Sequence, residues 1–406
     1  MNPRSTAEIV LGVAGGIASY KAAELLRLFT ESGHSVRVVP TPSSLNFVGA
    51  ATWEALSGKP VQTEVFDHVD EVPHVRIGQS ADLVVVAPAT ANLLAKAAHG
   101  LADDLLTNTL LTARCPVVMA PAMHTEMWEH PATQANVATL RDRGVVVLEP
   151  AVGRLTGADS GKGRLPDPTQ IHAAAMAVLD GRPRDLAGLK VVVSAGGTRE
   201  HLDPVRYLGN KSSGLQGYAV AEAAVARGAD VTIVAANVTL PDPAGASIVR
   251  VVSTDELRRA VLEASADADA IVMAAAPADF RPAEYLDAKI KKTSDTSAPE
   301  VKLVQNPDIL AELVATRTGK RPVIVGFAAE TGDANGSVID HARAKLERKG
   351  CDLLVVNDVS AGKVFGRDEN EAVVLAADGA VQQVPLGPKI DLAHVVWDSV
   401  SQRVDW

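Results

Sequence analysis

The sequence is poor in cysteine and has no long apolar run. Its 406 residues include two cysteines, Cys115 and Cys351, which excludes a disulfide framework and a four-thiolate metal site. No apolar stretch reaches the ~18 residues that a membrane-spanning helix needs, and the N-terminus lacks the pattern of a secretory signal. These absences predict a cytoplasmic protein with no membrane partner.

Aromatic and basic residues are also scarce. Aromatic side chains make up 3% of the chain, and 39 basic side chains against 49 acidic ones leave a formal net charge of −10. Nucleic-acid-binding proteins usually combine basic patches with aromatic stacking surfaces, so no nucleic-acid partner is expected. A hydrophobic fraction of 47% is instead typical of globular domains, and the length predicts two or three of them at ~150 residues each.

In the first part of the chain, apolar segments alternate with amphipathic ones, as in parallel α/β domains. Strands are predicted at 9–13, 35–39, 83–86, 116–120 and 144–148, and helices at 18–32, 91–98, 104–112, 133–143 and 168–179. Residues 153–168 hold four glycines and two prolines, which predicts an irregular, mobile loop and a candidate lid. This pattern indicates one doubly wound domain.

The pattern restarts at Lys190. The segment 191–200 begins a second strand-turn-helix unit, followed by a helix at 214–227 and a strand at 230–235. Further strands are predicted at 270–274, 322–326, 353–356 and 372–376, with helices at 254–264, 308–317 and 336–349. The prediction is therefore two doubly wound, Rossmann-like α/β domains at 1–180 and 190–406, joined by a linker at 181–189.

Each predicted domain has a glycine-rich turn after its first strand. Gly12, Gly15 and Gly16 offer the backbone amides and helix N-terminus that receive a phosphate. An NAD site also needs an acidic residue at the end of the second strand. That strand is instead followed by Thr41 and Ser43, whose hydroxyl groups favour a phosphate monoester such as that of FMN.

The second turn contains Gly196 and Gly197 and fails the same test, because its second strand ends at Asn237 without an acidic neighbour. The segment 157–163 also differs from a P-loop, since it is one residue short and has Gly163 where a Ser or Thr must reach the metal. A dehydrogenase and a P-loop NTPase are therefore disfavoured. A purely structural role for both turns stays open.

Four motifs of the first half form a set. They are GGIASYK at 15–21, His74 just before a strand, APATANLLAKAAHGLADDLL at 87–106 and PAMHTEMW at 121–128. This half resembles the homo-oligomeric flavin-containing cysteine decarboxylases, which implies a flavodoxin-like flavoprotein domain. The resemblance places FMN against Gly15, Ser19, Thr41, Ser43, Ala89, Asn92 and Met119, with Asn92 and Asp103 near a trimer interface.

The same resemblance implies the chemistry. His74 would take a proton while the flavin oxidises the thiol end of the substrate to a thioaldehyde, after which the carboxylate leaves as carbon dioxide. His124 is a departure, because the family has an Asn there that holds the substrate carboxylate. A second departure is the lack of a Cys between 153 and 164, where the family has one that assists the final reduction. Thr156, Asp159 and Ser160 are the polar candidates there, so either the proton donor has moved or this half is slower.

The second half carries longer motifs. They are SAGGTREHLDPVRYLGNKSSGLQG at 194–217, AAAPADF at 274–280, KIKK at 289–292, NPDIL at 306–310, GFAAET at 326–331 and ND at 357–358. This half resembles the phosphopantothenate-cysteine ligases, which implies CTP as co-substrate, an acyl-cytidylate intermediate and loss of pyrophosphate. Asn210 would hydrogen-bond that intermediate, and Lys289 would supply a positive charge, although a Lys run alone is equally compatible with a solvated patch.

The resemblance also outlines a nucleotide pocket. Its residues would be Gly196, Gly197, Ala274, Ala275, Ala276, Asp279, Lys289, Asn306, Pro307, Asp308, Ile309, Phe327, Lys345 and Lys349. Mg²⁺ would neutralise the triphosphate through hard oxygen ligands, but the motifs name no metal ligand.

Together the two sets resemble, in order, the bifunctional decarboxylase and ligase enzymes of coenzyme A biosynthesis. The implied function is CTP-dependent condensation of 4′-phosphopantothenate with cysteine, then FMN-dependent decarboxylation of phosphopantothenoylcysteine to 4′-phosphopantetheine. Flavin-domain trimers joined by ligase-domain dimers would make the homo-oligomer a dodecamer. Two alternatives stay open: a ligase whose flavin domain serves only assembly or regulation, and an N-terminal half that binds phosphatase-like partners without catalysis.

Overall fold

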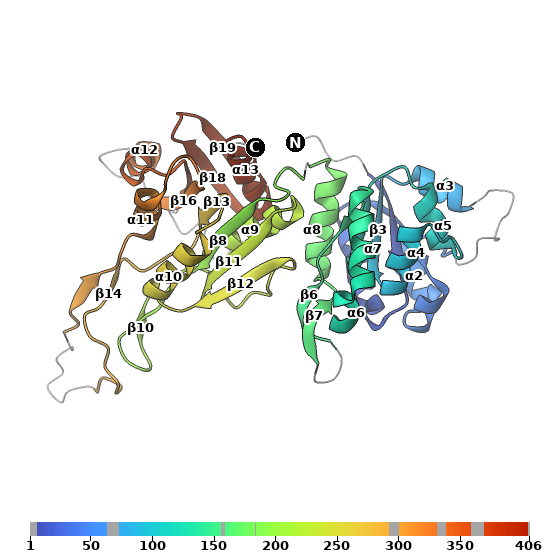
Figure 1. Cartoon of the computed structure of the whole chain (residues 1–406), viewed down its shortest axis with the longest axis horizontal. Helices are drawn as coiled ribbons and strands as arrows, with labels where there is room; N and C mark the ends of the chain where they lie inside the picture. The colour runs from blue at the N-terminus through green and yellow to red at the C-terminus, as the bar shows by residue number, and fades with distance from the viewer. Residues whose placement is uncertain are drawn as a thin grey trace. The chain divides into compact units, whose positions relative to one another are not determined.

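The computed structural model describes residues 6–62, 73–155, 159–182, 184–291, 300–330, 338–358 and 369–404. Thr156 and the last lysine of the KIKK motif, Lys292, lie outside these ranges. The chain divides into two compact units, Met1–Pro183 and Arg184–Trp406, which Figure 1 colours from blue to green and from green to red. Each unit is built on a mainly parallel sheet, which confirms the predicted fold class.

A five-stranded parallel sheet forms the centre of the first unit. Its strand order is β2-β1-β3-β4-β5, with bounds β1 Glu8–Val13, β2 Ser35–Pro40, β3 Leu83–Ala89, β4 Val117–Pro121 and β5 Val146–Val147. One face packs against α1 (Ala22–Glu31), α2 (Ala50–Ser57) and α8 (Pro168–Leu179). The other packs against α3 (Pro73–Ser80), α4 (Ala91–His99), α5 (Leu105–Thr112), α6 (Thr125–Glu129) and α7 (Pro131–Asp142). The strands are apolar because both faces are covered. The order in which strands are added to the sheet reverses between β1 and β3, which is the switch point where such sheets bind ligands.

The predicted helix 18–32 is shorter in the structure. Residues Ile17–Lys21 form a 3-10 turn (η1), and α1 begins only at Ala22. The buried hydroxyl of Ser19 explains the difference, because it lies 2.9 Å and 2.6 Å from the carbonyl oxygens of Ala14 and Gly16, to which it donates. This side-chain bond keeps the chain in a tight turn before the helix starts.

The segment 153–168 is not the irregular loop that its glycines and prolines predicted. It contains an antiparallel hairpin of β6 (Ala151–Arg154) and β7 (Ser160–Arg164). A Cβ at Gly161 would lie 2.3 Å from Thr125 Oγ1, and one at Gly163 would lie 2.2 Å from the carbonyl oxygen of Met123. The prediction was wrong because it treated these glycines as breakers, whereas they let β7 pass directly against residues 123–125.

The second unit is built on an eight-stranded sheet of order β12-β11-β8-β13-β16-β17-β18-β19. The bounds are β8 Lys190–Gly196, β11 Asp230–Ala236, β12 Ala246–Val251, β13 Ala270–Met273, β16 Val323–Glu330, β17 Leu353–Asp358, β18 Glu369–Ala376 and β19 Val381–Pro388. The first six strands in this order are parallel, and β18 and β19 are antiparallel to their neighbours. The carboxyl ends of β13, β16 and β17 therefore share an edge with the start of β18.

Helices cover both faces of this sheet. One face packs against α9 (Leu215–Ala226) and α13 (Lys389–Ser401), and the other against α10 (Thr254–Ala264), α11 (Ile309–Thr316) and α12 (Val338–Lys349). Two short hairpins, β9 (Glu200–His201) with β10 (Tyr207–Leu208) and β14 (Phe280–Pro282) with β15 (Leu303–Gln305), complete the unit. Figure 1 shows β10 and β14 extending away from the main sheet of this unit.

The second half of the predicted linker packs into the second unit. Leu186 and Leu189 are 0% and 6% exposed and belong to its core. Asp185 pairs with the guanidinium of Arg227 at 2.5 Å, and Arg227 also contacts Asp398 of α13 at 2.6 Å. Residues 184–189 are thus held by buried contacts, although their Gly and Pro neighbours gave them the composition of a linker.

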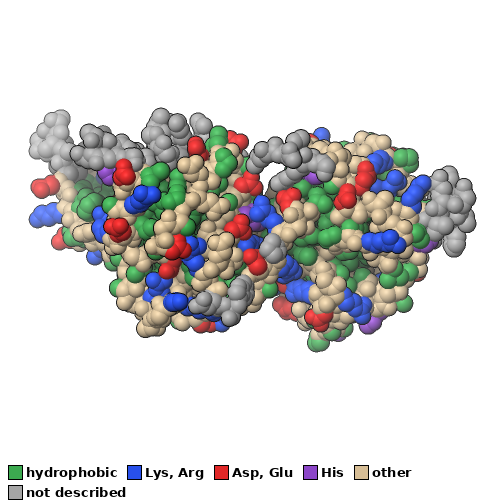
Figure 2. Space-filling model, turned by 90° about the horizontal axis from the view of Figure 1, so that it is seen from above, with side chains coloured by type: hydrophobic (Ala, Val, Ile, Leu, Met, Phe, Trp, Pro, Cys, Tyr) green, Lys and Arg blue, Asp and Glu red, His purple; other side chains and the backbone are tan. Residues whose placement is uncertain are grey.

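No helix in the described part of the chain is both long and apolar enough to cross a bilayer. On the faces visible in Figure 2, Lys and Arg side chains are interspersed with Asp and Glu. This mixed pattern differs from the basic stripe of a typical nucleic-acid-binding surface.

Candidate functional site

In the first unit, the loops after β1 and β2 touch at the carboxyl edge of the sheet. A Cβ at Gly15 would lie 2.3 Å from Ser43 Oγ, so only glycine lets the two loops come this close. The hydroxyl oxygens of Thr41 and Ser43 are 3.1 Å apart. Three predicted cofactor residues therefore meet at the switch point, in a setting where amides and hydroxyls bind phosphate.

The remaining predicted cofactor residues have other surroundings. The hydroxyl of Ser19 holds the turn before α1, and Ala89 and Met119 are 0% and 1% exposed within β3 and β4. Asn92 is exposed in the first turn of α4, and Asp103 pairs with Lys96 of the same helix at 2.7 Å. Ser19, Ala89 and Met119 are therefore buried. The roles of all these residues toward a cofactor stay predictions.

His74 lies in α3, a helix that the sequence analysis did not predict, rather than directly before a strand. The helix packs closely on α5, because a Cβ at Gly78 would lie 2.2 Å from Thr112 Oγ1. The same hydroxyl donates to the carbonyl oxygen of His74 at 2.7 Å. Within the described part of the chain, Nδ1 of His74 is buried without a hydrogen-bond partner. A buried ring nitrogen of this kind is an atom with which a ligand could pair.

His124 stands between two carboxylates. Its Nδ1 lies 3.1 Å from Glu126 Oε2, and its Nε2 lies 3.8 Å from Asp159 Oδ2. Asp159 directly precedes β7, so the hairpin brings one of the predicted polar residues of that segment to His124. Ser160, the other described candidate, is the exposed first residue of β7.

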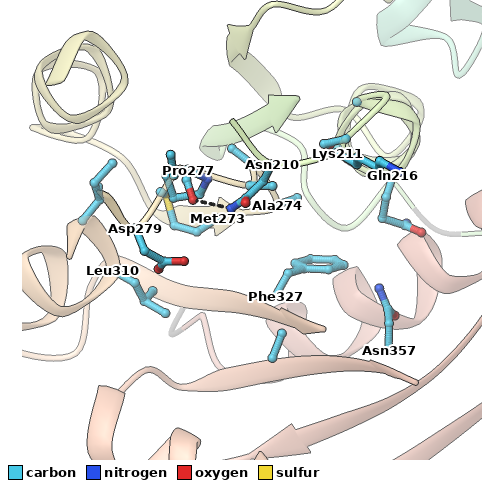
Figure 3. Close-up of a pocket in the computed structure, with 18 of the residues that line it drawn as sticks. Asn210, Lys211, Gln216, Met273, Ala274, Pro277, Asp279, Leu310, Phe327 and Asn357 are labelled. Carbon is cyan, nitrogen blue, oxygen red and sulfur yellow. Dashed lines mark hydrogen bonds between the residues drawn. The ribbon is translucent and has the colours of Figure 1, made fainter. Parts of the chain in front are cut away.

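The second unit contains a cavity of about 1010 Å³ along the carboxyl edge of its sheet. Its wall comes from the loop before α9, the loops after β13 and β15, the ends of β16 and β17, and α12 (Figure 3). The predicted nucleotide residues in this wall are Ala274, Ala275, Ala276, Asp279, Asn306, Pro307, Asp308, Ile309, Phe327, Lys345 and Lys349. Segments far apart in the sequence are thus brought around one space.

Asn210 belongs to the same wall and braces it. Its Nδ2 donates to the carbonyl oxygen of Pro277 at 2.8 Å, the dashed contact in Figure 3. Asn306 Nδ2 donates to the neighbouring carbonyl of Ala278, also at 2.8 Å. The loop after β13 is therefore held by carboxamides from two sides.

Charged groups line the side of the cavity near α11 and α12. Lys349 pairs with the carboxylate of Asp308, which also caps α11 by accepting from the N–H of Ala311 at 3.1 Å. Burial raises the pKa of Asp308, but the Lys349 ammonium and the Ala311 N–H outweigh it and bring that pKa below its ordinary value. Asp308 is therefore ionised at neutral pH and offsets part of the charge of Lys349.

Three predicted residues are not in the cavity wall. Gly196 (φ +84°) and Gly197 have no room for a side chain. A Cβ at Gly196 would lie 2.1 Å from the carbonyl oxygen of Ala236, and one at Gly197 would lie 2.7 Å from that of Asn210, so these glycines let the neighbouring loops come close. Lys289 is exposed, and its neighbour Ile290 donates its N–H to the buried carboxylate of Asp203 at 3.2 Å. The cavity wall of one chain includes Asn210 but not Lys289.

Four further wall residues form a polar group that the sequence analysis did not assign. Gln216 Nε2 donates to the carbonyl oxygen of Lys389 at 3.3 Å, and Asn370 Nδ2 donates to Gln216 Oε1 at 3.1 Å and to Asn357 Oδ1 at 3.2 Å. Asn370 is 3% exposed. Gln216 and Asn357 lie inside the motifs quoted above, so the sequence could have indicated them as site residues. Asn370 and Lys389 lie outside those motifs.

Comparisons with known proteins cover both units. The Flavoprotein family model matches residues 2–180, and the model of the DNA/pantothenate metabolism flavoprotein C-terminal domain matches residues 186–404. The coenzyme A biosynthesis bifunctional protein CoaBC of Mycolicibacterium smegmatis is 61% identical over 97% of both chains. The chain belongs to the CoaBC family. The CoaBC protein of Vibrio vulnificus is 41% identical over 95% of both chains.

The similarity to CoaBC proteins extends across the boundary between the units. A crystal structure of the C-terminal domain of a CoaBC protein is 30% identical, with a TM-score of 0.45, and covers 54% of this chain and 97% of its own. The full-length CoaBC relatives carry the family assignment, because they align with both units at once.

Proposed function

We propose that this chain catalyses two consecutive steps of coenzyme A biosynthesis. The unit Arg184–Trp406 condenses 4′-phosphopantothenate with cysteine at the expense of CTP, through an acyl-cytidylate and with loss of pyrophosphate. The unit Met1–Pro183 then decarboxylates phosphopantothenoylcysteine to 4′-phosphopantetheine. The observation that carries this proposal is the cavity of the second unit, where the predicted nucleotide residues converge in a chain related to CoaBC proteins over both units.

For the ligation, the cavity wall would supply charged side chains to the CTP phosphates and the metal ion, and an uncharged hydrogen-bond donor to the reacting centre. Lys345 and Lys349 would offset the negative charge of the CTP phosphates. Asp279 is an exposed carboxylate in the wall and offers a hard oxygen ligand for Mg²⁺. The described residues contain no group of three or more His, Cys, Asp or Glu side chains that could hold a metal. We propose that the cation is bound mainly through the triphosphate.

Asn210 is the proposed contact to the reacting centre. A carboxamide is an uncharged donor, which suits the acyl and phosphoryl oxygens where negative charge develops. Its bond to the Pro277 carbonyl orients this side chain at the cavity wall in advance. Preorganised donors are effective because they do not have to reorient during the reaction.

The residues at the carboxyl edge of the first unit fit FMN. The contact between Gly15 and Ser43 brings backbone amides and the hydroxyls of Thr41 and Ser43 to one point, which suits a phosphate monoester. When bound, FMN supplies a two-electron acceptor that oxidises the thiol-bearing carbon of the substrate and later returns the electrons. The Flavoprotein family match over residues 2–180 supports a flavin in this unit.

His74 and His124 are the proposed acid-base and positioning groups of the decarboxylation. His74 is held by the packing of α3 on α5, and its imidazole would take the proton that the substrate loses. At His124, Glu126 contacts Nδ1, whereas Asp159 lies at 3.8 Å from Nε2. The Glu126 carboxylate only accepts, so it holds a hydrogen on Nδ1, and Nε2 would donate to the substrate carboxylate when the ring is an imidazolium with hydrogens on both nitrogens.

We further propose that the chain assembles as a dodecamer in which flavin-domain trimers are joined by ligase-domain dimers. Light scattering with bound FMN tests this assembly, and a sharp monomer at micromolar concentration would contradict it. A ligase-only enzyme is not favoured, because the similarity to CoaBC relatives is continuous over both units.

The deciding experiment is mass spectrometry of the products formed from 4′-phosphopantothenate, cysteine, CTP and Mg²⁺ by the full chain with FMN. The proposal expects 4′-phosphopantetheine. Accumulation of phosphopantothenoylcysteine alone would leave a ligase only, and absence of both products would overturn the proposed function.

A further inference from the structure

The second unit contains a buried carboxylate that the proposed chemistry does not use. Glu200 of β9 is 5% exposed, and the neighbouring Thr198 and Thr254 are 1% and 0% exposed. None of these three residues is part of the cavity wall. Burying a carboxylate costs free energy unless it accepts strong hydrogen bonds. The hydrogen-bond partners of Glu200 therefore indicate its structural role.

An unbroken chain of hydrogen bonds leads from this carboxylate to the cavity. Glu200 Oε1 accepts from the backbone N–H of Thr254 at 2.8 Å and from its hydroxyl at 2.7 Å. Thr254 Oγ1 lies 2.9 Å from Thr198 Oγ1, which accepts from the backbone N–H of Ala278 at 2.9 Å. Ala278 lines the cavity.

The carboxylate fixes the direction of every bond in this chain. The hydroxyl of Thr254 donates to Glu200 Oε1, so its single hydrogen points to Glu200. Thr198 must therefore donate its own hydrogen to Thr254, which leaves its lone pairs facing the N–H of Ala278. Glu200 thus keeps Thr198 in the acceptor orientation that the loop requires.

The loop reached in this way is the one that the cavity residues brace from the other side. Asn210 and Asn306 bind the carbonyl oxygens of Pro277 and Ala278, while Thr198 binds the N–H of Ala278. Asp279, the proposed Mg²⁺ ligand, is the next residue. A shift of Ala278 would therefore move both the backbone that faces the nucleotide and the carboxylate beside it.

We propose that Glu200, Thr254 and Thr198 form a positioning relay that sets the loop 276–279 against the nucleotide. This inference rests on the proposed ligase function. The relay touches no substrate and acts through Ala278. Its loss raises the KM for CTP and leaves the KM for cysteine and the decarboxylation rate unchanged.

Thr198→Val in the full chain is the first test, because valine keeps the shape of threonine and cannot accept a hydrogen bond. The KM for CTP is expected to rise about tenfold, because an unpaired buried N–H shifts the equilibrium of the loop away from its native position by a factor of roughly 5 to 150, and CTP binding must restore that position. Thr198→Ser restores the acceptor and should return the KM to within about threefold of wild type. Thr232→Val, in β11 outside the relay, is the matched control and should leave the KM for CTP unchanged.

A double-mutant cycle separates a relay from three independent contacts. Thr254→Val removes the hydroxyl bond to Glu200 but keeps the backbone bond and leaves Thr198 in place, so its effect should be smaller than that of Thr198→Val. Combining the two should add nothing beyond Thr198→Val, because residues in one hydrogen-bond chain are not additive. Should Thr198→Val not fold, the KM of Thr254→Val for CTP decides.

Three results would overturn the relay. The first is an unchanged KM for CTP in Thr198→Val or Thr254→Val, and the second is additive effects of the two substitutions in the double variant. The third is an equal change in every kinetic constant together with a lower melting temperature. Failure of the proposed function is distinct from these, because the wild-type chain would then form no phosphopantothenoylcysteine from CTP.

Discussion

The two units assemble their predicted site residues differently. In the second unit, the predicted wall residues come from five separate segments and surround one cavity within a single chain, because α12 and the start of β18 fold around the carboxyl edge. In the first unit, Gly15, Thr41 and Ser43 meet at the edge, but no hydrogen bond or ion pair of the described residues connects them to His74 or His124. The second unit thus surrounds its predicted residues within one chain, because later segments close around the sheet edge. For the first unit, the proposal is that trimer formation completes the flavin site.

The largest expected effect tests the first unit. His74→Asn should lower carbon dioxide release from phosphopantothenoylcysteine by about 100- to 10,000-fold, the usual worth of general-base assistance. FMN absorbance, the oligomer and the ligation rate should be unchanged, because His74 lies in α3 of the first unit. His99→Asn, at the exposed end of α4, is the matched control and should retain full activity. Decarboxylation by His74→Asn at the wild-type rate would exclude it as the base.

The next prediction concerns the second unit. Lys289→Gln should slow amide formation by about 100- to 1,000-fold, because a charge at the reacting centre is lost. Lys291→Gln removes a lysine two positions away and should have little effect. Decarboxylation of added phosphopantothenoylcysteine should be normal in both variants. If decarboxylation is lost together with ligation, the variant is misfolded or the two activities are assigned to the wrong units.

The position of Lys289 allows a sharper version of this test. Since the cavity wall of one chain includes Asn210 but not Lys289, the dimer proposed for this unit suggests that Lys289 acts in the cavity of the second copy. Co-folding Lys289→Gln with Asn210→Asp chains should then restore ligation, because one cavity of each mixed dimer has both native residues. If the mixture is no more active than the two variants measured apart, Lys289 reaches the cavity of its own chain.

Gly163→Ala should have an intermediate effect on the first unit. The new Cβ would lie 2.2 Å from the carbonyl oxygen of Met123, so β7 must move away from His124. We expect a loss of about 1–3 kcal/mol in the free energy of unfolding, as for other overpacked sites, and slower decarboxylation with normal ligation. Gly33→Ala is the control: Gly33 also has positive φ (+86°) but has open space around it, so calorimetry should show a smaller loss that reflects backbone strain alone.

The sequence predicted those strands that carry a continuous apolar signal. The run Leu83–Val86 is an example, because both faces of β3 are buried. β12 and β19 were not predicted, since they are the two edge strands of the sheet and only one residue of each is buried. α13 was also not predicted, because its buried face includes Lys389 and His394, whose polarity hides the helical pattern.

The same distinction holds for the cavity. Its motif residues were predicted because each motif keeps neighbouring wall residues together, as in 274–280 and 306–310. Asn370 and Lys389 are single polar residues outside any motif, and they reach the cavity through the pairing of β18 with β17 and the docking of α13. Such tertiary placement leaves no local signal in the sequence.

The smallest expected effect concerns His124, where the resemblance to the flavin-containing cysteine decarboxylases predicts an Asn. His124→Asn introduces that residue, and a carboxamide donates the same kind of hydrogen bond to a carboxylate, so decarboxylation should stay within about tenfold of wild type. Glu126 is exposed and contacts His124 from two positions further along the chain, so Glu126→Gln tests this contact with His124 intact and should retain the same activity. His124→Leu, which cannot donate, should raise the KM for phosphopantothenoylcysteine while FMN binding and ligation stay normal. A His124→Asn variant as inactive as His74→Asn would show that the imidazole of His124 takes part in proton transfer and does not merely hold the carboxylate.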